Sequence, residues 1–122
     1  MNKFSLLITA LICFMTVSLS AQSIVGKWKF EFPTDQGTMV MAADIKADGT
    51  YALDFGNDGS VETTGKYTQD GNTMTIQDDG GDCTGKGVYQ VSVDGDTMTM
   101  VRVSDECANR GGPEGKMVTT RL

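Results

Sequence analysis

The stretch that decides the fold is residues 88–102, VYQVSVDGDTMTMVR, where apolar and polar side chains alternate on both sides of the turn at Asp94-Gly95-Asp96. Alternation with a period of two is typical of a strand that buries one face, and threonine and other β-branched residues suit a pleated sheet. Glycine and aspartate readily supply the positive φ angles of a tight turn. The stretch therefore predicts two antiparallel strands joined by a short hairpin turn.

The same alternation recurs through residues 22–122, and no stretch there has apolar residues at helical spacing over three turns. Two further turns, at residues 47–50 and 70–73, resemble the one at residues 94–97. The predicted strands are residues 24–32, 38–46, 50–56, 60–68, 73–78, 85–93, 97–103 and 115–121. We expect an all-β domain of eight antiparallel strands in up-and-down order, closed into a barrel because closure removes exposed strand edges.

An immunoglobulin-like sandwich is the alternative architecture. Its usual cysteines lie on strands with a tryptophan between them. Here Cys83 and Cys107 fall in predicted loops and Trp28 precedes both. The cysteine positions therefore favour the barrel.

The N-terminus has the pattern of a secretory signal peptide. Lys3 precedes an uncharged apolar run over residues 4–17, and small residues follow, so cleavage after Ser20 or Ala21 is expected. The run is short for a membrane anchor, which needs about 20 residues. Cys13 lies within the run and lacks the preceding small residues of a lipoprotein site. We predict a signal peptide over residues 1–21, a mature domain over 22–122, no membrane span in that domain, and a secreted or periplasmic location.

The mature domain keeps two cysteines, which in an exported chain predict a disulfide between Cys83 and Cys107. In a meander the three short turns lie at one end of the barrel. The two longest loops, 79–86 and 104–114, lie at the other, open end, and each contains one cysteine. Strand parity thus brings the two cysteines to the same end.

Composition excludes several functions. A chain of 122 residues suits one domain, and a formal charge of −6 argues against nucleic acid as a partner. Histidine is absent, which excludes Ser–His and Cys–His nucleophiles and histidine-bound metals. We therefore expect no enzyme activity, no catalytic residues and no cofactor.

A calcium site is the one metal hypothesis that the acidic residues suggest. Asp54, Asn57, Asp58 and Glu62 fail the EF-hand pattern, because glycines stand at its third and twelfth positions counted from Asp54. The acidic run at residues 78–82 is expected to form turns and a solvated rim. No metal site is predicted.

The first strand begins Ile24-Val25-Gly26-Lys27-Trp28. A Gly-x-Trp near the start of an eight-stranded meander resembles the lipocalin signature, although this chain is shorter than typical lipocalins and has no helix after the last strand. In that family the tryptophan packs across the closed barrel end beneath an arginine of the last strand, a role that the resemblance gives to Arg121. The chain is thus similar to a small bacterial lipocalin-like, calycin-type domain. Small periplasmic inhibitors of metalloproteases share the barrel type.

The parity that buries Trp28 predicts an inward-facing set. Its members are Ile24, Trp28, Phe30, Phe32, Met39, Met41, Ile45, Tyr51, Leu53, Phe55, Val61, Tyr67, Met74, Ile76, Tyr89, Val91, Met98, Met100, Arg102 and Met117. Methionines are frequent at adaptable binding surfaces, which suggests a pocket for an apolar ligand. Small eight-stranded barrels are also filled by their own side chains, so a packed core or a shallow mouth pocket is favoured over a deep one.

The leading hypothesis is a binding protein for a small apolar or amphipathic ligand, held at the open end. The expected contact residues lie on the open halves of the strands: Phe30, Phe32, Met39, Met41, Leu53, Phe55, Tyr89, Met100, Arg102 and Met117. The alternative is a protein-binding module, such as an inhibitor, that acts through its loops or N-terminal segment.

Two arginines near the open end have competing interpretations. Arg102 is expected either to bind a ligand carboxylate or to form an internal ion pair with Asp105 or another carboxylate, and the ion pair is favoured. Arg110 has the same two interpretations and is expected to lie on the surface.

Overall fold

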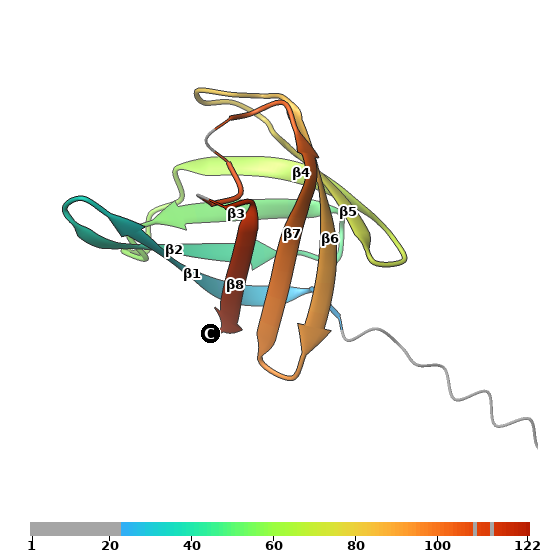
Figure 1. Ribbon diagram of the computed structural model, residues 1–122, viewed down its shortest axis with the longest axis horizontal. Coiled ribbons are helices and arrows are strands. Elements are labelled where there is room, and N and C mark those ends of the chain that lie inside the picture. The colour runs from blue at the N-terminus through green and yellow to red at the C-terminus, as the bar shows by residue number, and fades with distance from the viewer. Residues whose placement is uncertain (1–22, 109, 113) are drawn as a thin grey trace, which may run out of the picture.

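The computed structural model describes residues 23–108, 110–112 and 114–122. The predicted signal peptide, residues 1–21, lies outside the described residues. All eight predicted strands are present and no helix occurs in the described part of the chain, which confirms the all-β prediction. In chain order the strands are β1 (Gly26–Thr34), β2 (Gly37–Ile45), β3 (Thr50–Phe55), β4 (Thr63–Asp70), β5 (Thr73–Asp78), β6 (Lys86–Asp94), β7 (Thr97–Asp105) and β8 (Lys116–Arg121) (Figure 1).

Each strand pairs antiparallel with the next, and β8 pairs with β1, so the sheet closes into the predicted up-and-down barrel. The sandwich alternative is wrong. Most strand ends lie within two residues of the prediction, and β5 matches it at both ends. Closure follows from the alternation, because a sheet with one apolar face buries that face most completely by curving around it.

The start of β4 is the largest error of the sequence prediction. Residues 60–62 belong to the β3–β4 loop, and Val61, predicted to point inward, is 57% exposed. Carboxylates fold this loop: Asp54 accepts hydrogen bonds from the Asp58 and Gly59 amides, and Glu62 accepts one from the Phe55 amide. The loop spans residues 56–62 and is as long as the β5–β6 loop at residues 79–85, so the predicted ranking of the open-end loops is also corrected.

The two ends of the barrel differ as strand parity predicts. The β2–β3, β4–β5 and β6–β7 connections form the closed end, where Gly71 and Gly95 each have a φ of +59° in two-residue turns. The β5–β6 and β7–β8 loops lie side by side at the open end, at the top of Figure 1, and the Cys83–Cys107 disulfide joins them. The predicted disulfide is confirmed.

Side chains fill the closed end of the barrel next to β1, β6, β7 and β8. Trp28, Met98 and Thr119 are fully buried and pack with Ile24 and Val91. The Trp28 indole donates a 2.8 Å hydrogen bond to the Ile24 carbonyl, and the Thr119 hydroxyl donates to the Met98 carbonyl at 3.2 Å. These bonds satisfy polar groups that would otherwise be buried at a cost of about 1–3 kcal/mol each.

Candidate functional site

The barrel is hollow from its open end down to Ile45, Tyr51 and Met74, which stand beside the closed-end turns. A cavity of about 840 Å³ opens to solvent at the end where the β5–β6 and β7–β8 loops lie. Ligand pockets typically measure about 300–1,000 Å³, so this space has room for a small molecule. The favoured expectation of a packed core or a shallow pocket is therefore wrong, although side chains do pack around Trp28 at the closed end.

Nine of the ten residues predicted to contact a ligand line this cavity. They are Phe30, Phe32, Met39, Met41, Leu53, Phe55, Met100, Arg102 and Met117. Tyr89 is fully buried behind the wall and donates its hydroxyl proton to the Asp105 carboxylate. Strand direction and side-chain parity thus find inward-facing strand residues near the open end. They do not find the wall residues of the loops, at 80–83, 106–108 and 110–112.

The β1–β3 side of the cavity is apolar and reaches the rim. Met39 and Phe55 are 44% and 40% exposed there, although both belong to the inward face. The Phe30 and Phe32 rings stack along β1 with centroids 6.2 Å apart. Exposed apolar side chains at a concave opening are characteristic of binding sites, since burying them would stabilise a complex.

The opposite side of the cavity is polar and is built on one arginine. Arg110 holds Asp105 with two parallel 2.9 Å hydrogen bonds, from Nε and Nη2, and Nη2 also donates to the Gly85 carbonyl at 2.7 Å. Its Nη1 lies 3.7 Å from an oxygen of Asp78, whose other oxygen accepts the Tyr51 hydroxyl proton. The Asp105 side chain is only 1% exposed. Arg110 therefore ties the β7–β8 loop to the ends of β5, β6 and β7, and the prediction that it lies on the surface is wrong.

This network changes the ionisation of its members. Burial acts to raise the pKa of the Asp105 carboxyl, but hydrogen bonds from Arg110, Tyr89 and the Cys107 amide outweigh burial and hold that pKa below its usual value. Burial and the bond to Asp105 raise the pKa of Tyr89 to about 12. Burial and the neighbouring Asp78 also raise the pKa of Tyr51. Near neutral pH Asp105 is therefore ionised, and Tyr51 and Tyr89 are neutral.

Arg102 has a different role from the one favoured by the sequence. Its Nη2 donates to the Arg110 carbonyl and, at 3.4 Å, to the Gly112 carbonyl, while Nε is buried without a hydrogen-bond partner. The expected ion pair with Asp105 is made by Arg110 instead. Within the described residues Arg102 makes no ion pair, and its guanidinium holds the β7–β8 loop against the barrel while lining the cavity.

The closed end carries the predicted Gly26, Trp28 and Arg121 constellation. The Arg121 guanidinium lies 4.2 Å from the Trp28 ring centre and donates hydrogen bonds to the Val25 and Ser23 carbonyls. Gly26 has a φ of +136°, and a Cβ there would stand 2.8 Å from Arg121 Nη1. Glycine is therefore required by the backbone and by the close approach of the arginine.

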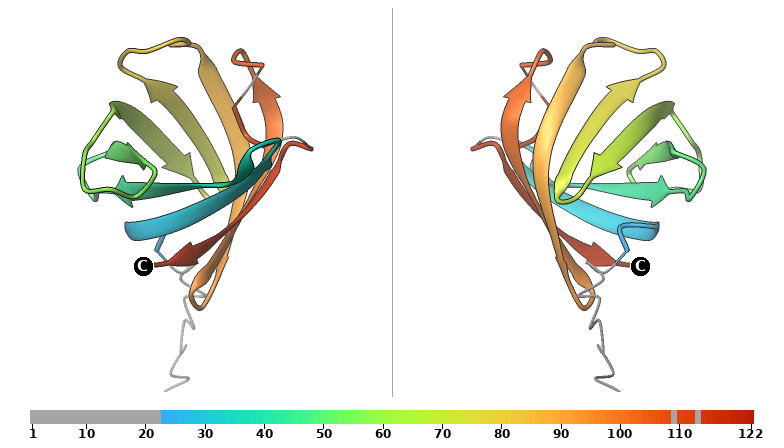
Figure 2. Two further views of the ribbon diagram at one scale, coloured as in Figure 1. Left: turned by 90° about the vertical axis from the view of Figure 1, so that its left-hand side faces the viewer. Right: turned by 90° about the vertical axis from the view of Figure 1, so that its right-hand side faces the viewer.

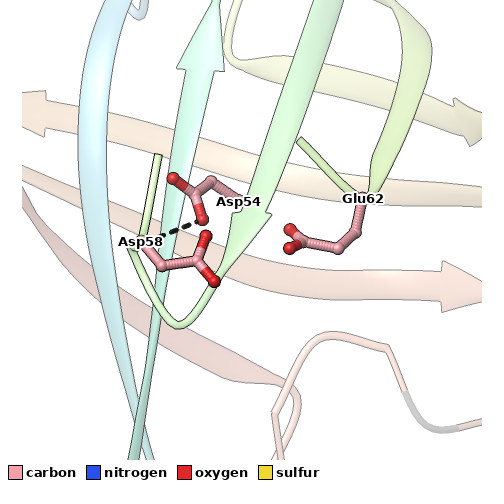
Figure 3. A group of neighbouring side chains, drawn as sticks. All are labelled: Asp54, Asp58 and Glu62. Atoms are coloured by element: carbon pink, nitrogen blue, oxygen red, sulfur yellow. Dashed lines mark hydrogen bonds between the residues drawn. The ribbon is translucent and has the colours of Figure 1, made fainter. Parts of the chain in front are cut away.

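Asp54, Asp58 and Glu62 gather at the β3–β4 loop (Figure 3), and their carboxylate oxygens lie within 4.8 Å of one another. Asp54 and Glu62 already accept backbone amide protons, and Asp58 accepts one from Ser60. Their arrangement is explained by the folding of the loop, and we assign no metal to it.

A closed eight-stranded barrel with a ligand-sized cavity at one end and an arginine-capped Gly-x-Trp at the other defines a class of small binding barrels. The chain belongs to the lipocalin-like domain family, whose profile matches residues 24–100. No curated protein and no solved structure matches the chain significantly. In the described residues no helix is long and apolar enough to cross a membrane.

Proposed function

We propose that the protein is a secreted or periplasmic binding protein that holds a small amphipathic ligand in the open half of its barrel. The observation that carries the proposal is the 840 Å³ cavity, whose wall is apolar along β1–β3 and polar along the β5–β6 and β7–β8 loops. The family supports it, since a lipocalin-like barrel is a small-ligand-binding fold. The disulfide and the predicted signal peptide support the location outside the cytoplasm.

The lining suggests how such a ligand is oriented. An acyl or aromatic body would pack on the apolar wall, where Phe32, Met41 and Leu53 are available. An acidic head would lie toward Arg102, whose charge is not balanced by a carboxylate in its own hydrogen bonds. A guanidinium suits a carboxylate because its planar donors match two oxygens.

The test is a titration of fatty acids and aromatic acids, each beside its neutral alcohol or amide. Arg102→Met should weaken the acids by about 1.5–3 kcal/mol, the value of a hydrogen bond to a charged group, and barely change the neutral analogues. Lys66→Met is the matched control, because it also removes one positive charge but lies on the exposed outer face of β4. It should change the affinity neither for the acids nor for the neutral analogues.

Comparing acid with neutral analogue separates head-group recognition from any loosening of the β7–β8 loop in Arg102→Met. Equal losses for both would contradict the role of Arg102. If no compound in the panel binds saturably, the protein-binding alternative is favoured, with the exposed Met39 and Phe55 at the rim as its contact surface.

A further inference from the structure

The barrel closes incompletely along one seam. β1 pairs with β8 at only three positions, Trp28 with Arg121, Lys29 with Thr120 and Phe30 with Thr119. By contrast, β1 pairs with β2 along its whole length, from Gly26 to Thr34. Beyond Phe30 the two strands diverge, and Figure 1 shows β8 rising beside β7 while the β1–β2 hairpin extends away from it.

A proline disfavours pairing in the outer part of the seam. The Leu122 amide donates to the Lys27 carbonyl, so alternate residues of β1 from Lys27 onward direct their backbone groups toward β8. Pro33 is one of these residues and has no N–H to donate. A ladder extended along the seam would lose this hydrogen bond, and proline is accordingly confined to such edges.

A second cavity, of about 140 Å³, lies in the open part of the seam. It is lined by residues 30–33 of β1 and residues 116–118 of β8. Three of these residues, Phe30, Phe32 and Met117, also line the main cavity. The two cavities are therefore separated by apolar side chains that line both of them. Pro33 and Val118 are exposed and stand at the outer edges of the seam, which we call its lips.

We propose that the seam is a second subsite, which takes the terminal segment of a flexible alkyl chain whose remainder occupies the main cavity. The proposal rests on the proposed function and adds the ligand class, a chain too long for the main cavity alone. An enclosed apolar cavity of about 150 Å³ is large enough to bind benzene. The seam has a similar volume, and so has room for several methylene groups, but it opens to solvent and its lining includes Glu31 and Lys116.

The chemistry of the seam favours a chain end over a peptide strand or a charged group. Pro33 removes a donor that an added strand would need. Glu31 is already paired with Lys29 at 3.1 Å, so its carboxylate is not free to bind a cation. Glu31 and Lys116 are the charged residues of the lining and are exposed, while Phe30, Phe32, Pro33, Met117 and Val118 present apolar surface.

The experiment compares a homologous series of straight-chain carboxylates from octanoate to octadecanoate. Each methylene that is buried improves affinity by about fourfold. We test wild type beside Val118→Trp, which places a large ring at the lip of the seam, and Val103→Trp, an equally exposed position on β7 that lines neither cavity. Circular dichroism and thermal midpoints check that both variants fold.

Val118→Trp should leave the short acids within twofold of wild type and weaken the long acids by at least tenfold, while Val103→Trp changes neither. In wild-type protein, the amide NMR signals of Glu31 and Val118 should shift with long acids and stay in place with short ones, a readout that needs no variant. Normal long-chain affinity in Val118→Trp, or unmoved seam amides, would overturn the seam subsite while leaving the main cavity intact. Failure of every acid to bind would instead overturn the proposed function, and the seam subsite with it.

Discussion

The Arg121 guanidinium lies over the Trp28 ring at the closed end of the barrel, 4.2 Å from the ring centre. The arginine belongs to the last strand and the tryptophan to the first, so their contact joins the two ends of the domain at the only place where β1 and β8 pair. A cation over an indole contributes about 0.5–2 kcal/mol, and the hydrogen bonds from Arg121 to the carbonyls of residues 23 and 25 hold it in place.

Truncation of the tryptophan should show how much the closed end stabilises the domain. We expect Trp28→Ala to lower the free energy of unfolding by about 3–5 kcal/mol, the range for removing a buried aromatic side chain. Arg121→Ala should expose the indole to solvent, which acrylamide quenching measures cleanly because Trp28 is the single tryptophan. Quenching that stays the same after Arg121→Ala would show that the arginine does not cover the ring.

Reduction of the Cys83–Cys107 disulfide should lower the thermal midpoint and leave the β-sheet circular dichroism signal largely intact at room temperature. The disulfide joins loops and closes a segment with a sequence separation of 24, which corresponds to roughly 3–4 kcal/mol in the chain-entropy view. The Cys83→Ser, Cys107→Ser double variant is the control, since reductant should not change it. Two reactive thiols in the denatured, unreduced mature protein would contradict the pairing.

Loss of the Asp105 charge should destabilise the open end in a pH-dependent way. The pKa of Asp105 is lowered in the folded state, so its ionised form stabilises the fold fully above the unfolded value of about 3.9. That contribution is lost as pH falls through the lower, folded pKa. We expect Asp105→Asn to cost about 3–5 kcal/mol near pH 7, because Arg110 then lacks its buried partner.

The sign of this effect is checked by denaturant unfolding of wild type and Asp105→Asn from pH 7 to pH 2. The stability difference between the two proteins should shrink below about pH 4. Asp94→Asn, on the exposed closed end, is the matched carboxylate control. A difference that stays constant down to pH 2 would show that the Asp105 charge is not what stabilises the fold.

Substitution of Gly65, in β4, should destabilise the protein as much as substitution of a core residue. Tyr51 pairs with Gly65 across β3 and β4, and a Cβ on Gly65 would stand 2.2 Å from the Tyr51 ring. The ring crosses the glycine to reach Asp78 on β5. We expect Gly65→Ala to displace the ring and cost about 1–3 kcal/mol, whereas Gly80→Ala, with open space around it, should cost much less.

A double-mutant cycle tests whether Gly65→Ala destabilises the protein by displacing the Tyr51 ring. Tyr51→Phe should destabilise wild type, because the hydrogen bond to Asp78 is lost, and should have little effect once Gly65→Ala has already moved the ring. Additive losses in the cycle would show that the alanine acts elsewhere.

The barrel could be predicted because its determinants are local in sequence. Alternation in residues 97–100 and 73–76 specifies strands, and Asp-Gly turns specify hairpins, so chain direction and the inward face follow without any long-range information. The same reasoning finds the inward-facing strand residues of the cavity wall near the open end and brings Cys83 to Cys107.

The errors occur where a side chain, and not the alternation, decides the conformation. The alternation places Val61 in a strand, but the Asp54 and Glu62 carboxylates accept backbone hydrogen bonds that hold this segment as a loop. Arg110 lies in a loop without any alternation pattern. Its pairing with Asp105 depends on the path that the β7–β8 loop takes across the barrel end. The hollow in the open half depends on barrel volume, which the sequence pattern does not specify. Asn57-Asp58-Gly59-Ser60 was the one local signal that could have corrected the start of β4.

The two sides of the cavity rim are held by different kinds of interaction. On one side the Cys83–Cys107 bond, the Arg110 hydrogen bond to Gly85 and the Glu106 hydrogen bond to Lys86 fasten two loops to each other. On the other side Met39 and Phe55 stand at hairpin ends, where main-chain hydrogen bonds such as that from the Gly56 amide to the Val40 carbonyl join β2 to β3, and the described residues there form no disulfide. The polar side of the rim is therefore cross-linked by a disulfide and the apolar side is not. We expect the protein to discriminate between ligands by their polar end and to tolerate variation in their hydrocarbon part.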